Sequence, residues 1–182
     1  MTVKLSYNIV LDALKSVVAD AGPDFVYDPP ETGFYEATSN TCVYRHPETG
    51  AASCGVGRAF DKLGLLDVIN YEAQPDPEDY SDIANSEAVY DIVEFMVGNG
   101  YAEFESTEDE NNSVKLLSDF QQLQDMQAPY GKALEVVTGG DEAAIRNYID
   151  LTSKVWLDSY NASMIAKNDK KIAAKNLEET GN

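Results

Sequence analysis

Apolar residues recur three and four positions apart along most of the chain, which is the spacing of amphipathic helices. The pattern predicts a first helix over about 5–21, ended by Gly22 and Pro23. Further helices are expected at about 55–64, 86–97, 116–126 and 129–137. From Asp141 the spacing continues for about 28 residues, which corresponds to a helix on the order of 40 Å long.

Extended segments interrupt the helical pattern in the first third of the chain. Two runs of small and β-favouring residues flank the turn formers from His46 to Gly50, and this arrangement predicts a β-hairpin at 41–54. The apolar run Phe25–Tyr27 predicts a brief strand or an extended segment. Tyr101–Glu105 also alternates, although the run is short.

These elements indicate an α+β fold that is mainly α, with about six helices, a small β-hairpin and a long C-terminal helix. Residues 1–140 are expected to form one helical domain that contains the hairpin. Residues 141–182 are expected to form the long helix and a frayed tail, packed on that domain or projecting from it. A chain of 182 residues is long enough to bury a substantial core.

Negative charge is concentrated in the middle of the chain. The formal net charge is −19, and the stretch between Lys62 and Lys115 contains fourteen acidic residues and no Lys or Arg. Within it, 70–85 and 106–112 are expected to be solvated acidic loops. Such a field repels nucleic acids and anionic membranes, so we expect neither to bind directly and expect a basic protein partner instead.

The N-terminal residues Met1–Leu5 lack the charged-then-apolar layout of a signal peptide, and no apolar run approaches the length that spans a bilayer. These features predict a cytoplasmic protein. Two cysteines do not suggest a disulfide scaffold, and the cytosol keeps thiols reduced, so both are expected to be free.

Cys42, His46 and Cys54 are candidate zinc ligands, because thiolate and imidazole are the groups that zinc prefers and a hairpin could bring them together. A closed structural site needs a fourth ligand, and the sequence offers neither a CxxC pair nor a second histidine. The favoured interpretation is that both cysteines are small buried residues. No metal and no other cofactor is predicted.

Cys54 also precedes a predicted helix N-terminus, where the helix dipole lowers the pKa of a thiol, and His46 could act as its base. This arrangement suits a cysteine-dependent enzyme, but no third residue that would orient the histidine can be identified. The sequence therefore favours a protein without catalytic residues and keeps the enzyme as an alternative.

The chain contains, in order, the short motifs Asp24-Phe25-Val26-Tyr27, Cys42-Val43-Tyr44, Cys54-Gly55-Val56-Gly57 and Leu63-Gly64. A Gln-Asp run that ends at Asp125 is followed by Tyr130-Gly131-Lys132-Ala133-Leu134. Over about 24–138, the chain resembles a group of uncharacterised small proteins encoded by actinobacteriophages and their hosts. The resemblance implies no catalytic residue. It implies a phage setting, in the host cytoplasm, where small acidic proteins often inhibit a host protein.

The function that we expect is therefore binding and inhibition of a basic host protein through the negative surface. Carboxylates on a rigid surface can imitate a DNA backbone, so a nucleic-acid-binding protein is one such partner and the inhibition could be anti-defence. The candidate partner-binding residues are the acids Asp76, Glu78, Asp79, Asp82, Glu103, Glu105, Glu108, Asp109 and Glu110. The plainer interpretation is that these acids provide solubility alone.

A structural or assembly protein that forms a homodimer through its last helix is a further alternative. Aromatic and branched residues recur on that helix, as they do at many protein contacts. The dimer candidates are Tyr148, Val155, Trp156 and Tyr160.

Overall fold

The structure is a computed structural model that describes residues 2–28, 43–70, 83–84, 87–140, 142–151 and 154. It is mainly helical, as expected. The helices are α1 (Tyr7–Ala21), α2 (Gly55–Lys62), α3 (Val89–Gly98), α4 (Thr107–Asp125) and α5 (Tyr130–Thr138), with a 3-10 turn η1 (Leu66–Val68). Residues 142–151 form a further helical segment.

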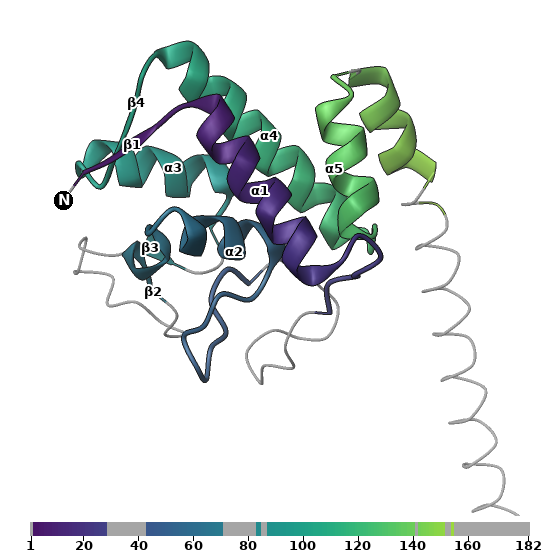
Figure 1. Cartoon of the computed structure of the whole chain (residues 1–182), viewed down its shortest axis with the longest axis horizontal. Coiled ribbons are helices and arrows are strands. Elements are labelled where there is room, and N and C mark those ends of the chain that lie inside the picture. The colour runs from purple at the N-terminus through teal and green to yellow at the C-terminus, as the bar shows by residue number, and fades with distance from the viewer. Residues whose placement is uncertain are drawn as a thin grey trace, which may run out of the picture.

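Helix α1 lies at the centre of the arrangement, where it packs against α2, α4 and α5 (Figure 1). Its buried face repeats at helical spacing and consists of Val10, Ala13, Leu14, Val17 and Val18. Burial of one such side chain contributes about 1.5–3 kcal/mol to the stability of the fold. The packing of this face therefore stabilises the helix more than the helix propensity of its residues does. The helix ends at Gly22, whose φ of 94° is unfavourable for residues with a side chain.

Two very short parallel strand pairs accompany the helices. β1 (Val3–Leu5) pairs with β4 (Ala102–Phe104), with Lys4 opposite Glu103. β2 (Ile69–Asn70) pairs with β3 (Ile83–Ala84). The first helix therefore begins two residues later than the expected 5–21, because Leu5 ends a strand and Ser6 provides the N-cap position. Phe25–Tyr27, expected to be a brief strand or an extended segment, has no regular secondary structure.

Of the β-hairpin expected at 41–54, the described residues 43–54 contain one antiparallel bridge, between Arg45 and Ala52. The His46 amide donates to Ala51 O (2.7 Å) and the Ser53 amide donates to Tyr44 O (2.9 Å). The Cys54 amide also donates to Val43 O (3.1 Å), and Cys54 is the N-cap of α2. Helix α2 then presses on the bridge so closely that a Cβ on Gly57 would lie 2.1 Å from Tyr44 O.

The stretch 106–112, expected to be an acidic loop, is instead the beginning of α4, which starts nine residues before the expected 116. Ser106 is its N-cap, and the Ser106 side chain accepts a hydrogen bond from the Asp109 amide. Glu108, Asp109 and Glu110 occupy the first turn, where carboxylates interact favourably with the helix dipole. The cluster of acidic residues therefore indicates the N-terminus of a helix at this position, not a loop.

The described part of the C-terminal region lies against the domain. Ile145 is buried, and Tyr148 and Ile149 pack against the core as partly buried residues. Most of the long helix that the sequence predicts lies outside the described residues, and so do Val155, Trp156 and Tyr160.

Candidate functional site

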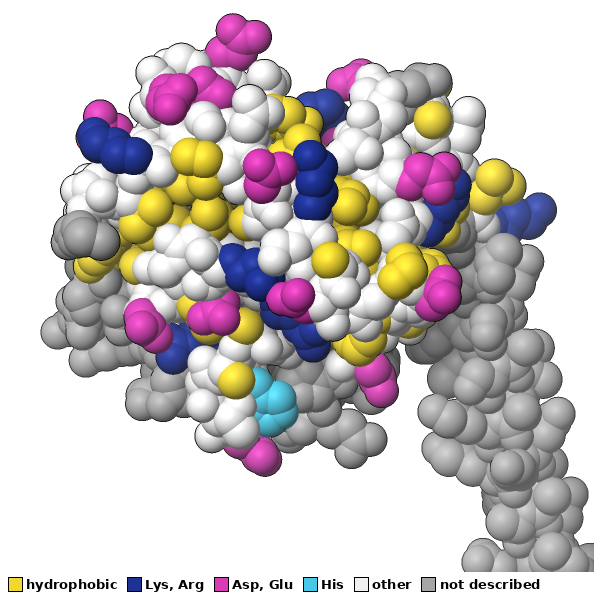
Figure 2. All heavy atoms as spheres, in the orientation of Figure 1, with side chains coloured by type: hydrophobic (Ala, Val, Ile, Leu, Met, Phe, Trp, Pro, Cys, Tyr) yellow, Lys and Arg dark blue, Asp and Glu magenta, His cyan; other side chains and the backbone are white. Residues whose placement is uncertain are grey.

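Most of the described acids of the central block lie on or directly beside three elements that contact one another: α3, β4 and the first turn of α4. Asp67 on η1, which pairs with Arg45, and Glu87 before α3 are the exceptions. Figure 2 shows acidic side chains over the end of the molecule where α4 begins. We call this region the α3–α4 surface. It comprises Tyr90, Asp91, Glu94, Tyr101, Glu103, Glu105, Glu108, Asp109, Glu110, Asn111 and Val114.

The predicted partner-binding acids have different roles on this surface. Glu103 forms an ion pair with Lys4. No described cation pairs with Glu105, Glu108 or Glu110, which leaves their charge available for a partner. Four further predicted acids lie outside the described residues: Asp76, Glu78, Asp79 and Asp82.

Asp109 joins the starts of two helices. Its Oδ1 accepts a hydrogen bond from the Tyr7 amide at the first turn of α1 (2.9 Å), and its Oδ2 accepts one from the Ser106 hydroxyl (2.7 Å). The bond from Ser106, followed by the one from Tyr7, lowers the pKa of Asp109. Since both oxygens are occupied, the structure favours a capping role for Asp109.

A small hollow lies between α3 and α4 within this surface. Its volume is about 100 Å³, and its lining residues are Tyr90, Glu94, Glu110, Asn111 and Val114. Tyr90 is 58% exposed although it is a large aromatic residue. Tyr90 and Glu94 are not among the site residues predicted from the sequence, because only the packing of α3 on α4 brings them beside Glu110.

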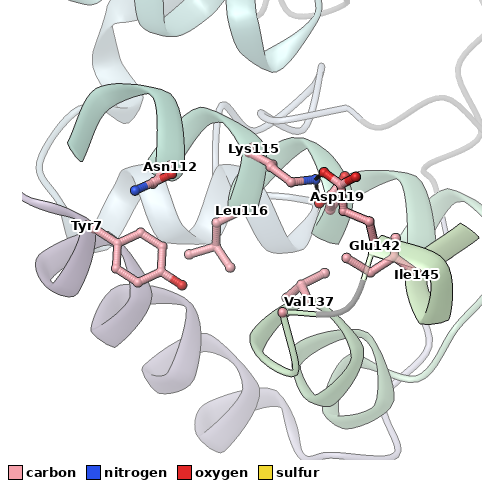
Figure 3. A pocket seen from close by; sticks show the side chains of 9 residues that line it. Tyr7, Asn112, Lys115, Leu116, Asp119, Val137, Glu142 and Ile145 are labelled. Atoms are coloured by element: carbon pink, nitrogen blue, oxygen red, sulfur yellow. Dashed lines mark hydrogen bonds and ion pairs between the residues drawn. The ribbon is translucent and has the colours of Figure 1, made fainter. Parts of the chain in front are cut away.

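A second hollow, of about 240 Å³, lies where α1, α4 and α5 meet the helical segment 142–151 (Figure 3). Lys115 on α4 contacts both Asp119 (3.0 Å) and Glu142 (3.5 Å), which ties α4 to that segment. The hydrogen bond with Asp119 raises the pKa of Lys115. Leu116, Val137 and Ile145 give this hollow an apolar lining. With its one lysine already paired with two carboxylates, the hollow serves to seat the last described helix.

The expectation of free thiols is wrong, because Cys54 is disulfide-bonded. Cys42, the only other cysteine, lies outside the described residues. Cys54 is completely buried at the start of α2, and its Sγ accepts a hydrogen bond from the Gly57 amide (3.3 Å). A disulfide sulfur offers no thiolate, so in this state Cys54 is neither a nucleophile nor a zinc ligand.

His46 is also occupied, since its Nδ1 accepts a hydrogen bond from the Glu48 amide (3.2 Å). The described part of the chain contains no group of three metal-ligating side chains. The arrangement of Cys42, His46 and Cys54 that would support zinc binding or catalysis is therefore not assembled among the described residues.

Parts of several motifs on which the resemblance rests meet around the start of α2. The Gly55 amide donates to Gln124 Oε1 (2.6 Å), and the Tyr130 amide donates to Phe25 O (2.9 Å). The Gly131 amide donates to Pro23 O (2.8 Å). These segments are distant in sequence, so the motifs mark a shared structural junction between the loop after α1, α2 and the α4–α5 turn.

The same junction contains a largely buried carboxyl group that the sequence did not reveal. Burial raises the pKa of Asp125 to about 7. Its Oδ1 is buried and accepts no hydrogen bond. Arg58 on α2, in the same junction, donates from Nε to Ser53 O (3.1 Å), and its guanidinium lies 5.0 Å from the centre of the Phe25 ring.

No helix among the described residues combines the length and the apolar character that crossing a bilayer requires. No protein-family model, curated protein or solved structure matches this chain.

Proposed function

We propose that this chain is a non-enzymatic binding protein that takes up a basic host protein on its α3–α4 surface and inhibits it. The observation that carries the proposal is the set of exposed carboxylates Glu94 on α3, Glu105 directly after β4 and Glu108 on the first turn of α4, which have no described cation partner. A fixed array of negative charges attracts a basic partner and raises the rate of association.

The surface also has the apolar component that protein interfaces contain. Tyr90 is 58% exposed and Tyr101 is 38% exposed, in a region otherwise rich in carboxylates. Tyrosine is enriched at the energetically important positions of interfaces. A surface that served solubility alone would gain nothing from exposed aromatic rings.

The finer proposal is a phage-type setting, in which the partner is a nucleic-acid-binding host protein and the carboxylates compete with the phosphate backbone. Cytoplasmic binding belongs to this proposal as well. Cytosolic reductants act on accessible disulfides, and the complete burial of Cys54 supports persistence of its disulfide there.

The test is quantitative capture of basic proteins from bacterial lysate by the immobilised chain. We expect basic proteins to be retained at about 50 mM salt and released at about 500 mM, because exposed charges are screened at high salt. Neutralisation of Glu94, Glu105 and Glu108 to Gln should abolish the capture. A second variant neutralises Asp76, Glu78, Asp79 and Asp82, which lie outside the described residues.

The matched control neutralises three acids on other elements: Asp12, Asp61 and Glu135. It removes the same formal charge and should retain capture. Equal loss in the control and in the Glu94, Glu105 and Glu108 variant would reduce the effect to net charge and refute a defined site. A captured nucleic-acid-binding protein should lose its affinity for DNA in proportion to the amount of chain bound.

A further inference from the structure

The hollow between α3 and α4 has the size of a single side chain. Pockets that hold a cofactor or a drug-sized ligand occupy roughly 300–1,000 Å³. This hollow occupies about 100 Å³. A nucleotide or cofactor is therefore excluded, whereas the end of one long side chain of a partner fits.

The walls of the hollow differ in chemistry. Val114 is partly buried against the core and provides an apolar floor. The Tyr90 ring, 58% exposed, forms an aromatic wall. Glu94 and Glu110 add two carboxylates that pair with no described cation, and Asn111 adds an amide.

The outward face of α3 continues this combination beyond the hollow. Asp91 and Glu94 are exposed on it, and the rings of Phe95 and Tyr101 stack with centroids 6.2 Å apart. No described element covers Tyr90 or Tyr101, which are 58% and 38% exposed. The face thus presents flat rings beside carboxylates, which is complementary to a cation on an apolar stem.

We propose that the hollow between α3 and α4 receives an arginine side chain of the basic partner, with the guanidinium stacked on Tyr90 and hydrogen-bonded to Glu94 and Glu110. The inference rests on the proposed function, since it identifies the group that the α3–α4 surface recognises. Arginine suits the site better than lysine for two reasons. Its planar, weakly hydrated guanidinium stacks on aromatic rings, and its five N–H donors can reach two carboxylates at once.

The test compares fluorescently labelled nona-arginine and nona-lysine peptides, which carry equal charge, by anisotropy titration at low salt. We expect the arginine peptide to bind about tenfold more tightly, the magnitude of a partly desolvated cation–π contact. Tyr90→Leu removes the ring but keeps an apolar side chain. It should bring the two affinities together while the affinity for nona-lysine stays unchanged.

Tyr101→Leu is the matched control, because it removes an exposed ring of the same surface outside the hollow and should keep the arginine preference. Glu110→Gln is the second variant and should reduce the preference. Circular dichroism of each variant verifies that it is folded. An arginine preference that survives both Tyr90→Leu and Glu110→Gln, or equal wild-type affinities for the two peptides, overturns the inference and leaves the proposed function standing. If neither peptide binds at low salt, the proposed function itself fails.

Discussion

Replacement of Asp125 by Asn should stabilise the protein at pH 8 and leave its stability nearly unchanged at pH 4. Asp125 lies in the junction between α2 and the α4–α5 turn, where burial raises its pKa from 3.8 to about 7. At a pH between these two pKa values, Asp125 carries a proton in the folded chain but not in the unfolded chain. The free energy of unfolding therefore falls as the pH rises from about 4 to about 7. Above pH 7, where the buried carboxyl is ionised, the destabilisation has its full size.

The magnitude follows from the size of the shift. A rise from 3.8 to about 7 is a difference of about three pH units, and at about 1.4 kcal/mol per unit it corresponds to about 4 kcal/mol. Since Asp125 is not completely buried, solvent reduces this figure, and we expect a gain of about 2–4 kcal/mol for the Asn variant at pH 8. Desolvation of the carboxylate is the larger cause of the raised pKa, and the side-chain hydrogen bond with Gln124 opposes it in part.

The assay is urea unfolding of the non-reduced protein, followed by far-ultraviolet circular dichroism at pH 5, 6, 7 and 8 and constant ionic strength. The difference in unfolding free energy between Asp125→Asn and wild type should grow with pH and reach a plateau above pH 7. Asp61→Asn, on the exposed side of α2, is the control and should show no such growth. A difference that is the same at pH 5 and pH 8, or an Asn variant no more stable than wild type at pH 8, refutes the reasoning.

Three more predictions concern the caps, the disulfide and the close packing of α2. Asp109→Ala removes a carboxylate that accepts hydrogen bonds from the Tyr7 amide of α1 and from the hydroxyl of Ser106, the N-cap of α4, so it should destabilise the fold above pH 4. Because the pKa of Asp109 is lowered in the folded chain, its stabilising effect is present above the unfolded pKa near 3.8 and disappears as the pH falls through the folded pKa. The stabilities of wild type and variant should therefore converge in acid titrations followed by circular dichroism. A thiol-reactive dye should detect no free thiol in the non-reduced chain, and reduction should lower stability by about 2–4 kcal/mol; labelling of Cys54 without reductant would contradict the structure. Gly57→Ala should cost about 1–3 kcal/mol or more in urea unfolding, because the added Cβ would meet Tyr44 O at 2.1 Å. Gly98→Ala on α3, which has open space around it, should be neutral or stabilising, and equal costs at the two positions would show that close packing is not the cause.

The proposed function and the fold are linked through the start of α4. The acids of its first turn stabilise the helix through its dipole, and the same turn places Glu110 beside Tyr90 and Glu94. Glu108 and Glu110 therefore have a structural effect as well as the proposed recognition role. Binding measurements on their variants need the unfolding free energy beside them.

Local patterns in the sequence were sufficient to predict the positions of most of the described helices. The apolar spacing predicted α1, α2, α3 and α5 to within a few residues, because a helix that buries one face must repeat its apolar residues every three to four positions. Gly22 and Pro23 predicted the end of α1 for an equally local reason. The start of α4 was also readable in principle, since Ser106 stands three residues before Asp109 in the manner of a capping box. The run of acids outweighed that signal.

Only the tertiary structure decided which residues far apart in sequence lie together. The pairing of β1 with β4, the junction around Gln124 and Gly55, and the hollow that unites Tyr90 with Glu110 all depend on how helices pack. The same is true of Asp125, because a carboxyl group acquires a raised pKa from the burial that other segments impose. Composition established that the chain is acidic. Long-range packing decides which carboxylates form ion pairs, cap helices, lie buried or stay exposed. No local sequence pattern encodes that packing.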